Sequence, residues 1–199
     1  MTIAAWRRGS GLVGLWLWLA LAPVRAAPDD LVLSAATGVA EDGAAEIGQP
    51  RPALEVDALD GGLVNDARVR GHALIVDFFA TWCEPCHRAL ADLIAARGAS
   101  GATGVTIVLV DLGEPRALVR KWAASAKLPD DVTIALDPAG VAARRWGARR
   151  LPTTYLVDAD GVVRHINRGW GPGYRDRLSR WMRVISQPDK RSDGPSGGI

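Results

Sequence analysis

The chain has 199 residues, of which 48% are hydrophobic, and this length suits one domain with a sizeable core. Its first 26 residues contain three arginines and no acid, so the remainder carries 21 basic and 22 acidic side chains. This near-neutral balance excludes a strongly basic protein, and we expect no nucleic-acid partner.

The first segment predicts export. Arg7 and Arg8 precede an apolar run over residues 11–24, and small residues surround Ala26, which is the arrangement of a signal peptide. Pro23 interrupts the run, which is shorter than the roughly 20 residues needed to cross a bilayer. We therefore predict a signal peptide over residues 1–26, cleaved after Ala26. An uncleaved segment would anchor the protein at the membrane.

Three further segments follow the predicted signal peptide. Residues 27–46 are rich in Ala, Gly and acids without a sustained period, which predicts a linker or a loosely ordered arm. Residues 47–186 have the patterns of a folded domain. Residues 187–199 combine Pro, Gly, Ser and charges, which predicts a flexible tail.

The first half of the domain predicts a hairpin followed by parallel strands. The Asp-Gly-Gly sequence at residues 60–62 lies between two short apolar runs and indicates a β-hairpin. Residues 73–80 and 105–111 are nearly continuous apolar runs, typical of strands buried on both faces. Helical patterns over residues 85–97 and after Pro115 follow these runs, which favours right-handed crossovers.

The second half predicts an antiparallel addition to the sheet. A strand at residues 132–136 and a helix at residues 138–146 precede two β-rich runs joined by Asp-Ala-Asp-Gly. Residues 174–186 then place apolar side chains on one helical stripe. The expected fold is α/β, with a mixed central sheet flanked by helices and an added N-terminal β-hairpin.

The only two cysteines, Cys83 and Cys86, lie where the first buried strand gives way to a helix. Unpaired backbone N–H groups and the helix dipole favour a thiolate at that position, and the thiolate is the nucleophile. The spacing allows Cys83 to attack a disulfide and Cys86 to resolve the mixed disulfide. We therefore interpret the pair as a reactive dithiol.

Two other interpretations of the cysteines are weaker. A disulfide that closes so short a loop removes little chain entropy, so a structural bridge is disfavoured. Zinc requires more ligands than one cysteine pair provides, and we expect His87 to point away along the helix, with His72 and His165 in other elements. No metal ligand is therefore predicted, although a two-thiolate copper(I) site stays open as an alternative.

The segments "VDFFATWCEPC" and "LPTTYLVDADG" resemble the thioredoxin superfamily. Together with the predicted export signal and the hairpin, they are similar to its periplasmic TlpA/ResA-like branch. The resemblance covers about residues 47–185 and implies a periplasmic thiol-disulfide oxidoreductase. The same resemblance implies no cofactor other than the redox-active Cys83–Cys86 disulfide. A peroxidase is disfavoured because Thr81 lies only two residues before Cys83, unlike the Thr-x-x-Cys motif of peroxiredoxins.

The resemblance assigns roles to residues around the cysteines. Pro152 matches the family's cis-proline beside the disulfide, and the backbone of Leu151 would pair with an extended substrate. Trp82 matches the aromatic residue that shapes the exposed edge. Asp77 precedes Cys83 by six residues, like the buried acid that handles the proton of the resolving thiol. The family's Glu-x-Pro motif after the second cysteine is replaced here by Ala-Leu-Ala at residues 89–91.

The residues between the cysteines predict the direction of electron transfer. Strong oxidants have a histidine there, whereas this chain has Glu84 and Pro85, which favour a reductant. By resemblance, the partners are exported proteins with disulfides, such as apocytochrome c or copper-site cysteines, and a membrane electron donor. A dithiol oxidase or isomerase, and a copper-binding assembly protein that uses the same cysteines, are the alternatives.

Overall fold

The structure is a computed structural model that describes residues 39–40 and 44–187. The predicted signal peptide, the predicted tail beyond residue 187 and most of the predicted arm lie outside the described residues. Within the described part, no helix has both the length and the apolar character needed to cross a membrane.

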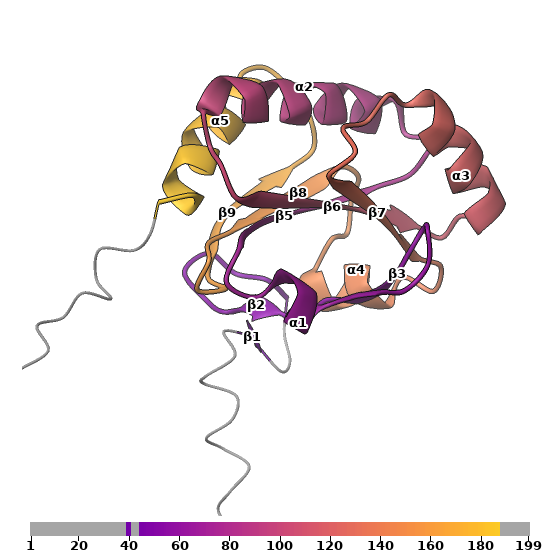
Figure 1. The fold of residues 1–199 in the computed structure, drawn as a ribbon, viewed down its shortest axis with the longest axis horizontal. Coiled ribbons are helices and arrows are strands. Elements are labelled where there is room, and N and C mark those ends of the chain that lie inside the picture. The colour runs from indigo at the N-terminus through magenta and orange to yellow at the C-terminus, as the bar shows by residue number, and fades with distance from the viewer. Residues whose placement is uncertain (1–38, 41–43, 188–199) are drawn as a thin grey trace, which may run out of the picture.

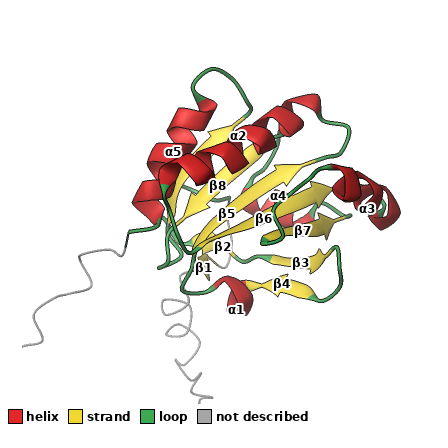
Figure 2. Cartoon of the chain, turned by 45° about the horizontal axis from the view of Figure 1, so that its top comes forward, coloured by secondary structure: helices red, strands yellow, loops and turns green. Residues whose placement is uncertain are grey.

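A seven-stranded mixed sheet forms the centre of the domain (Figures 1 and 2), in the order β4-β3-β7-β6-β5-β8-β9. β5, β6 and β7 are parallel, whereas β8 and β9 add an antiparallel pair beside β5. Every residue of β5 is buried, as its apolar run predicts for a central strand. The strands are β3 (Glu55–Ala58), β4 (Leu63–Asn65), β5 (Ala73–Phe79), β6 (Val105–Leu112), β7 (Val132–Asp137), β8 (Thr153–Val157) and β9 (Val163–Arg168).

Helices cover both faces of the sheet (Figure 1). α2 (Glu84–Ser100) and α5 (Tyr174–Ile185) lie together on one face, with α3 (Arg116–Ser125) beyond them over β7. α1 (Asp66–Val69) and α4 (Val141–Trp146) lie on the opposite face. Each face has its own apolar cluster, and the cluster under α2 and α5 contains both cysteines. The predicted α/β architecture is confirmed.

The strands before β5 lie outside the parallel centre of the sheet. β3 and β4 form the predicted hairpin, and β3 extends the sheet by pairing with β7. Gly61 and Gly62 both have positive φ, so this turn needs residues without a side chain. β1 (Val39–Ala40) lies inside the predicted arm and pairs in parallel with β2 (Arg51–Pro52), which follows the arm. Ala45 is buried and its N–H donates to Trp146 O at 3.2 Å, so this end of the arm is docked.

The helix predicted over residues 138–146 begins later, at Val141. The buried Asp137 carboxylate accepts hydrogen bonds from the N–H groups of Val141 and Ala143, each at 2.8 Å. The intervening Gly140 has a φ of +64°, which a right-handed helix does not allow. Asp137 therefore fixes the start of α4 from the end of β7.

Candidate functional site

Cys83 and Cys86 form a disulfide at the start of α2. Cys83 is the N-cap residue of this helix, and its backbone oxygen accepts the N–H of Cys86 at 2.9 Å and of His87 at 3.3 Å. The two residues are only 5% and 1% exposed. An approaching partner therefore meets the Cys83 side of the pair more readily, as expected for an attacking thiol in front of a resolving one.

The predicted substrate-binding residues are Trp82, Leu151 and Pro152, and Leu151 packs against the cluster that contains both cysteines. The Trp82 side chain is 73% exposed, so a large apolar ring faces solvent next to Cys83. The Leu151–Pro152 peptide bond is cis, as the resemblance predicts. Gly169 N–H donates to Pro152 O at 2.8 Å and fastens this loop to the end of β9.

Asp77 is the buried acid of the site. It lies on β5 and is 1% exposed, and its Oδ1 accepts the hydroxyl of Thr154 at 2.6 Å. Thr154 Oγ1 in turn accepts from the Tyr174 hydroxyl at 2.7 Å, and Tyr174 packs in the cluster that contains both cysteines. Burial raises the pKa of Asp77 to about 7, against the opposing effect of the Thr154 hydrogen bond. Near neutral pH this carboxyl group can therefore both release and accept a proton.

The two residues between the cysteines are exposed. Glu84 forms an ion pair with Arg88 at 3.2 Å, and its carboxylate lies 3.8 Å from Nδ1 of His87. These partners reduce the field that Glu84 exerts on the Cys83 sulfur. Glu84 therefore disfavours a Cys83 thiolate less than its charge alone would, whereas Pro85 lies in the first turn of α2, as predicted.

His87 does not point away along α2 as expected from the sequence. Its Nε2 lies 2.9 Å from Thr81 O, and its ring stacks on Trp122 with centroids 6.0 Å apart. This contact joins the first turn of α2 to the residues before its N-cap, Cys83, whose backbone is extended. Among the described residues, no group of three or more His, Cys, Asp or Glu side chains could hold a metal ion.

A second exposed aromatic residue, Trp170, was not found by sequence reasoning. Its Nε1 donates to Asp92 at 2.9 Å, Arg175 Nε donates to the same carboxylate at 2.9 Å, and Arg88 lies 5.3 Å from the ring centroid. The Trp170 hydrogen bond is the main cause of a lowered pKa at Asp92. Because Gly169 bonds to Pro152, Trp170 joins the cis-proline loop to α2. The only available signal was an unexplained Trp after β9.

Two buried acids, Asp111 and Glu114, were also missed. Asp111 ends the buried part of β6, and Glu114 follows in the next loop. Glu114 accepts the backbone N–H of Thr81 and, at 2.7 Å, its hydroxyl. These acids therefore reach the turn that carries Trp82 and Cys83. The position of these acids at the end of a buried strand was the available signal of a functional role. The sequence does not show which turn they contact.

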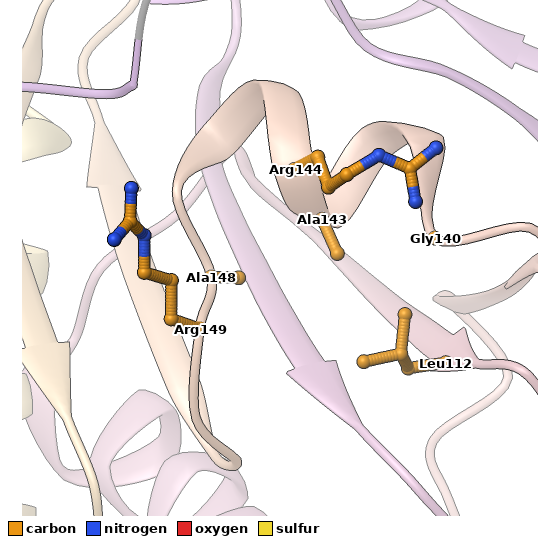
Figure 3. A pocket seen from close by; sticks show the side chains of 6 residues that line it. All are labelled: Leu112, Gly140, Ala143, Arg144, Ala148 and Arg149. Carbon is orange, nitrogen blue, oxygen red and sulfur yellow. The ribbon is translucent and has the colours of Figure 1, made fainter.

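A pocket of about 420 Å³ lies farther along the cis-proline loop. Figure 3 shows Arg144 and Arg149 on different sides of the small side chains of Ala143 and Ala148. Arg149, which lines the pocket, precedes Leu151 by two residues. The pocket is therefore next in sequence to the predicted substrate-binding loop. It contains no part of the disulfide. Its lining residues are Leu112, Gly140, Ala143, Arg144, Ala148 and Arg149.

Comparison with known proteins gives consistent matches over this region. Residues 47–166 match the model of the AhpC/TSA family. The thiol-disulfide oxidoreductase ResA of Geobacillus kaustophilus is 30% identical over 146 residues, which cover 70% of this chain and 83% of that protein. ResA of Bacillus anthracis is 24% identical over 163 residues, covering 78% and 92% of the two chains.

Solved structures show the same fold. A putative thiol:disulfide interchange protein DsbE from Chlorobium tepidum has a TM-score of 0.62 at 24% identity, covering 74% of this chain and all of that one. A putative protein disulfide isomerase from Bacteroides thetaiotaomicron has a TM-score of 0.63 at 18% identity, covering 71% and 91%. The family match spans the two cysteines and the cis-proline loop.

Proposed function

Because this chain belongs to the AhpC/TSA family and is a thiol-disulfide oxidoreductase of the thioredoxin superfamily, we propose that it reduces disulfides in selected exported proteins. The observation that carries the proposal is the Cys83–Cys86 disulfide at the start of α2, with Pro85 and no histidine between the cysteines. This arrangement can exchange two electrons with a dithiol or a disulfide.

The reaction begins with the reduced protein. The Cys83 thiolate attacks one sulfur of a substrate disulfide, a mixed disulfide forms, and the other substrate sulfur leaves as a thiolate that takes a proton from water. Cys86 then loses its proton and attacks the Cys83 sulfur. The Cys83–Cys86 bond forms, the second substrate sulfur is released, and the two electrons have passed from the protein to the substrate.

Asp77 is the proposed acceptor of the Cys86 proton. A carboxyl group with a pKa of about 7 is matched to a proton transfer at neutral pH, because neither of its forms is strongly disfavoured. Thr154 holds one carboxylate oxygen at 2.6 Å. The other oxygen, Oδ2, is buried and has no hydrogen-bond partner among the described residues, so it is the free position for the proton.

The substrate would bind across the exposed rim. An extended segment would pair with the backbone of Leu151, as in other cases of strand addition, and the rings of Trp82 and Trp170 would flank it on two sides. Trp170 is well suited to this role because Asp92 and Arg88 fix its ring beside the cis-proline loop. A rigid aromatic side chain loses little conformational entropy on binding.

The direction of transfer can be measured as a reduction potential. Thioredoxin has a potential near −270 mV and the strong oxidant DsbA near −120 mV. We expect a value on the thioredoxin side, from equilibration of the Cys83–Cys86 pair with glutathione. A potential above about −170 mV would instead favour the alternative activity of a dithiol oxidase or isomerase.

The substrates are proposed from the resemblance to the TlpA/ResA-like branch. They are the haem-binding cysteines of apocytochrome c or the copper-binding cysteines of an oxidase subunit, and a membrane electron donor would restore the dithiol. Cys86→Ser should retain the substrate as a stable mixed disulfide on Cys83, to be identified by mass spectrometry. Cys83→Ser is the matched control, because it lacks the attacking thiol and should trap nothing.

A copper-binding assembly protein is the alternative outside redox catalysis. Such a protein would purify with stoichiometric copper, and its copper content would depend on both cysteines. A reductase would reduce insulin disulfides and lose that activity in both Cys83→Ser and Cys86→Ser. These two measurements separate the classes.

The proposed place of action is the periplasm. N-terminal sequencing of the protein from that compartment should begin at Ala27 if the predicted signal peptide is cleaved. Recovery of the intact N-terminus in the membrane fraction would support the anchored form, in which the domain faces the periplasm.

A further inference from the structure

Two buried carboxyl groups lie beneath the active-site turn at residues 81–83 and have no part in the reaction above. Asp111 is fully buried and Glu114 is 8% exposed. In the parallel pairing of β5 with β6, Asp111 lies opposite Phe79, the last residue of β5. The two acids therefore lie near the end of β5, from which the chain continues to the cysteines.

The two carboxyl groups hold one proton between them. Asp111 Oδ1 accepts the backbone N–H of Glu114 at 3.1 Å, and the buried Asp111 Oδ2 has no hydrogen-bond partner among the described residues. One of two neighbouring buried carboxyl groups keeps its proton, because two adjacent charges of the same sign are strongly disfavoured there. Both oxygens of Glu114 already accept from Thr81, so the proton belongs on Asp111.

Thr81 is held by every polar atom it has. Its N–H and hydroxyl donate to Glu114, and its carbonyl oxygen lies 2.9 Å from His87 Nε2. Thr81 directly precedes Trp82 and Cys83, so its position sets where the exposed ring and the attacking sulfur stand. A shift of this residue would move both.

We propose that Glu114 is a positioning residue for the active-site turn, and that the proton shared with Asp111 keeps it bound to Thr81. Loss of the proton places two negative charges in a buried site, which drives Glu114 away from its partners and loosens the turn. The inference deepens the proposed function, on which it rests only for the use of Cys83 as the attacking thiol.

The pKa shifts agree with this geometry. Burial, together with the neighbouring Glu114, raises the pKa of Asp111 to about 7. Burial alone would raise the pKa of Glu114, but the hydrogen bonds from Asp111 and Thr81 outweigh it and lower this pKa. The pair therefore changes from one proton to none close to neutral pH.

Other charged groups around the pair do not neutralise it. On β5, the pKa of Asp77 responds to burial and Thr154. On α3, the Arg116 guanidinium donates to the carbonyls of Ala58 and Leu59, and on β7 the Asp137 carboxylate binds N–H groups of α4.

On α2, the Glu84 carboxylate pairs with Arg88 and lies 3.8 Å from the ring of His87. His87 reaches the pair only through the carbonyl of Thr81. Across the described residues, neither Asp111 nor Glu114 has an ion pair, so their shared proton is the only charge compensation.

The direct test is the pH titration of the Thr81 backbone amide in the oxidised protein, followed by 15N–1H NMR. In the wild type this resonance should shift with a midpoint near pH 7, because its acceptor is Glu114. Asp111→Asn should abolish that transition, since an Asn side chain has no proton to lose in this pH range. Asp160→Asn, an exposed acid in the β8–β9 turn, is the matched control and should keep it.

The functional readout is the pH profile of Cys83 alkylation in the reduced protein. Asp111→Asn should remove one transition near pH 7 from the profile of the alkylation rate. The transition that belongs to the ionisation of the Cys83 thiol should stay. Glu114→Gln should slow alkylation about tenfold, because Gln cannot accept both Thr81 bonds. If that variant fails to fold, Thr81→Val against Thr81→Ser isolates the hydroxyl contact, and only Val should slow the reaction.

A wild-type Thr81 amide without a transition near pH 7, or the same transition in Asp111→Asn, would overturn the inference. Equal alkylation rates in Thr81→Val and Thr81→Ser would also count against it. A high reduction potential with an intact Thr81 titration would remove only the proposed direction of electron transfer, because the NMR measurement does not depend on activity.

Discussion

Replacing Asp77 by Asn should change how the stability of the oxidised protein depends on pH. Asn has nearly the same shape, and its side-chain oxygen can still accept the Thr154 hydroxyl that lies 2.6 Å from Oδ1. The substitution removes only the ability to ionise. The buried Oδ2 has no partner among the described residues, so the amide nitrogen that replaces it breaks no hydrogen bond.

The magnitude follows from the pKa of Asp77 in the two states. Burial raises it from 3.8 to about 7 in the folded protein. Between these values the folded state keeps a proton that the unfolded state has released, so the free energy of unfolding falls as the pH rises. At 1.36 kcal/mol per unit, the total loss is about 4 kcal/mol. It is absent below pH 4 and complete above pH 7.

The assay is urea denaturation of the oxidised wild type and of Asp77→Asn at pH 4.5 and at pH 8. The variant should be more stable than the wild type by about 1 kcal/mol at the lower pH, which already lies above the unfolded pKa of 3.8, and by about 4 kcal/mol at the higher pH. Asp111 titrates in both proteins and cancels from the difference. The exposed Asp160→Asn should follow the wild type. Parallel pH dependences of the wild type and Asp77→Asn would refute an ionisable, buried Asp77.

Three further predictions concern the rim, the redox pair and the core. Trp170→Ala should raise the KM for a protein disulfide severalfold while the rate of Cys83 alkylation stays the same; an unchanged KM would remove Trp170 from the substrate site. Glu84→His should raise the reduction potential by about 30 mV, equivalent to 1.4 kcal/mol of thiolate stabilisation; redox titration with glutathione measures it, and a lower potential would contradict the electrostatic argument. Leu178→Ala should lower the free energy of unfolding by about 2–5 kcal/mol, because Leu178 is a fully buried residue of α5; denaturation at pH 7 measures this, and a loss below 1 kcal/mol would show that the cluster repacks.

The strands and the disulfide were predictable because their signals are local. The continuous apolar run of β5 specifies a strand buried on both faces, and Cys83 follows its end after the short turn of residues 80–82. The hairpin turn at Gly61 and Gly62 is likewise encoded by residues that tolerate positive φ. The cis state of Pro152 was predicted only by resemblance, since X-Pro bonds are usually trans.

The contacts that complete the site were not predictable because they join distant segments. Trp170 and Asp92 are 78 positions apart in the chain, and Thr81 and Glu114 are 33 apart. Hydrophobic periodicity reports which face of an element is buried, but it carries no information on which loops meet above the sheet. The predicted orientation of His87 was wrong for the same reason. Its side chain contacts the turn before α2, and the path of that turn is not encoded in the helical pattern.

The buried acids Asp77 and Asp111 lie on strands of the sheet, whereas the resemblance to the TlpA/ResA-like branch implies an acid on the helix after the cysteines. Ala89 replaces the first residue of the family's Glu-x-Pro motif, and it is fully buried in the cluster around the cysteines. A glutamate there would bring a carboxyl group into that cluster from α2. Here Asp77 on β5 and Asp111 on β6 supply buried carboxyl groups from below, both with a pKa of about 7. If Asp77 takes the proton of Cys86 and Asp111 keeps Glu114 bound to Thr81, as proposed above, a single change in pH affects the chemistry and its geometry together.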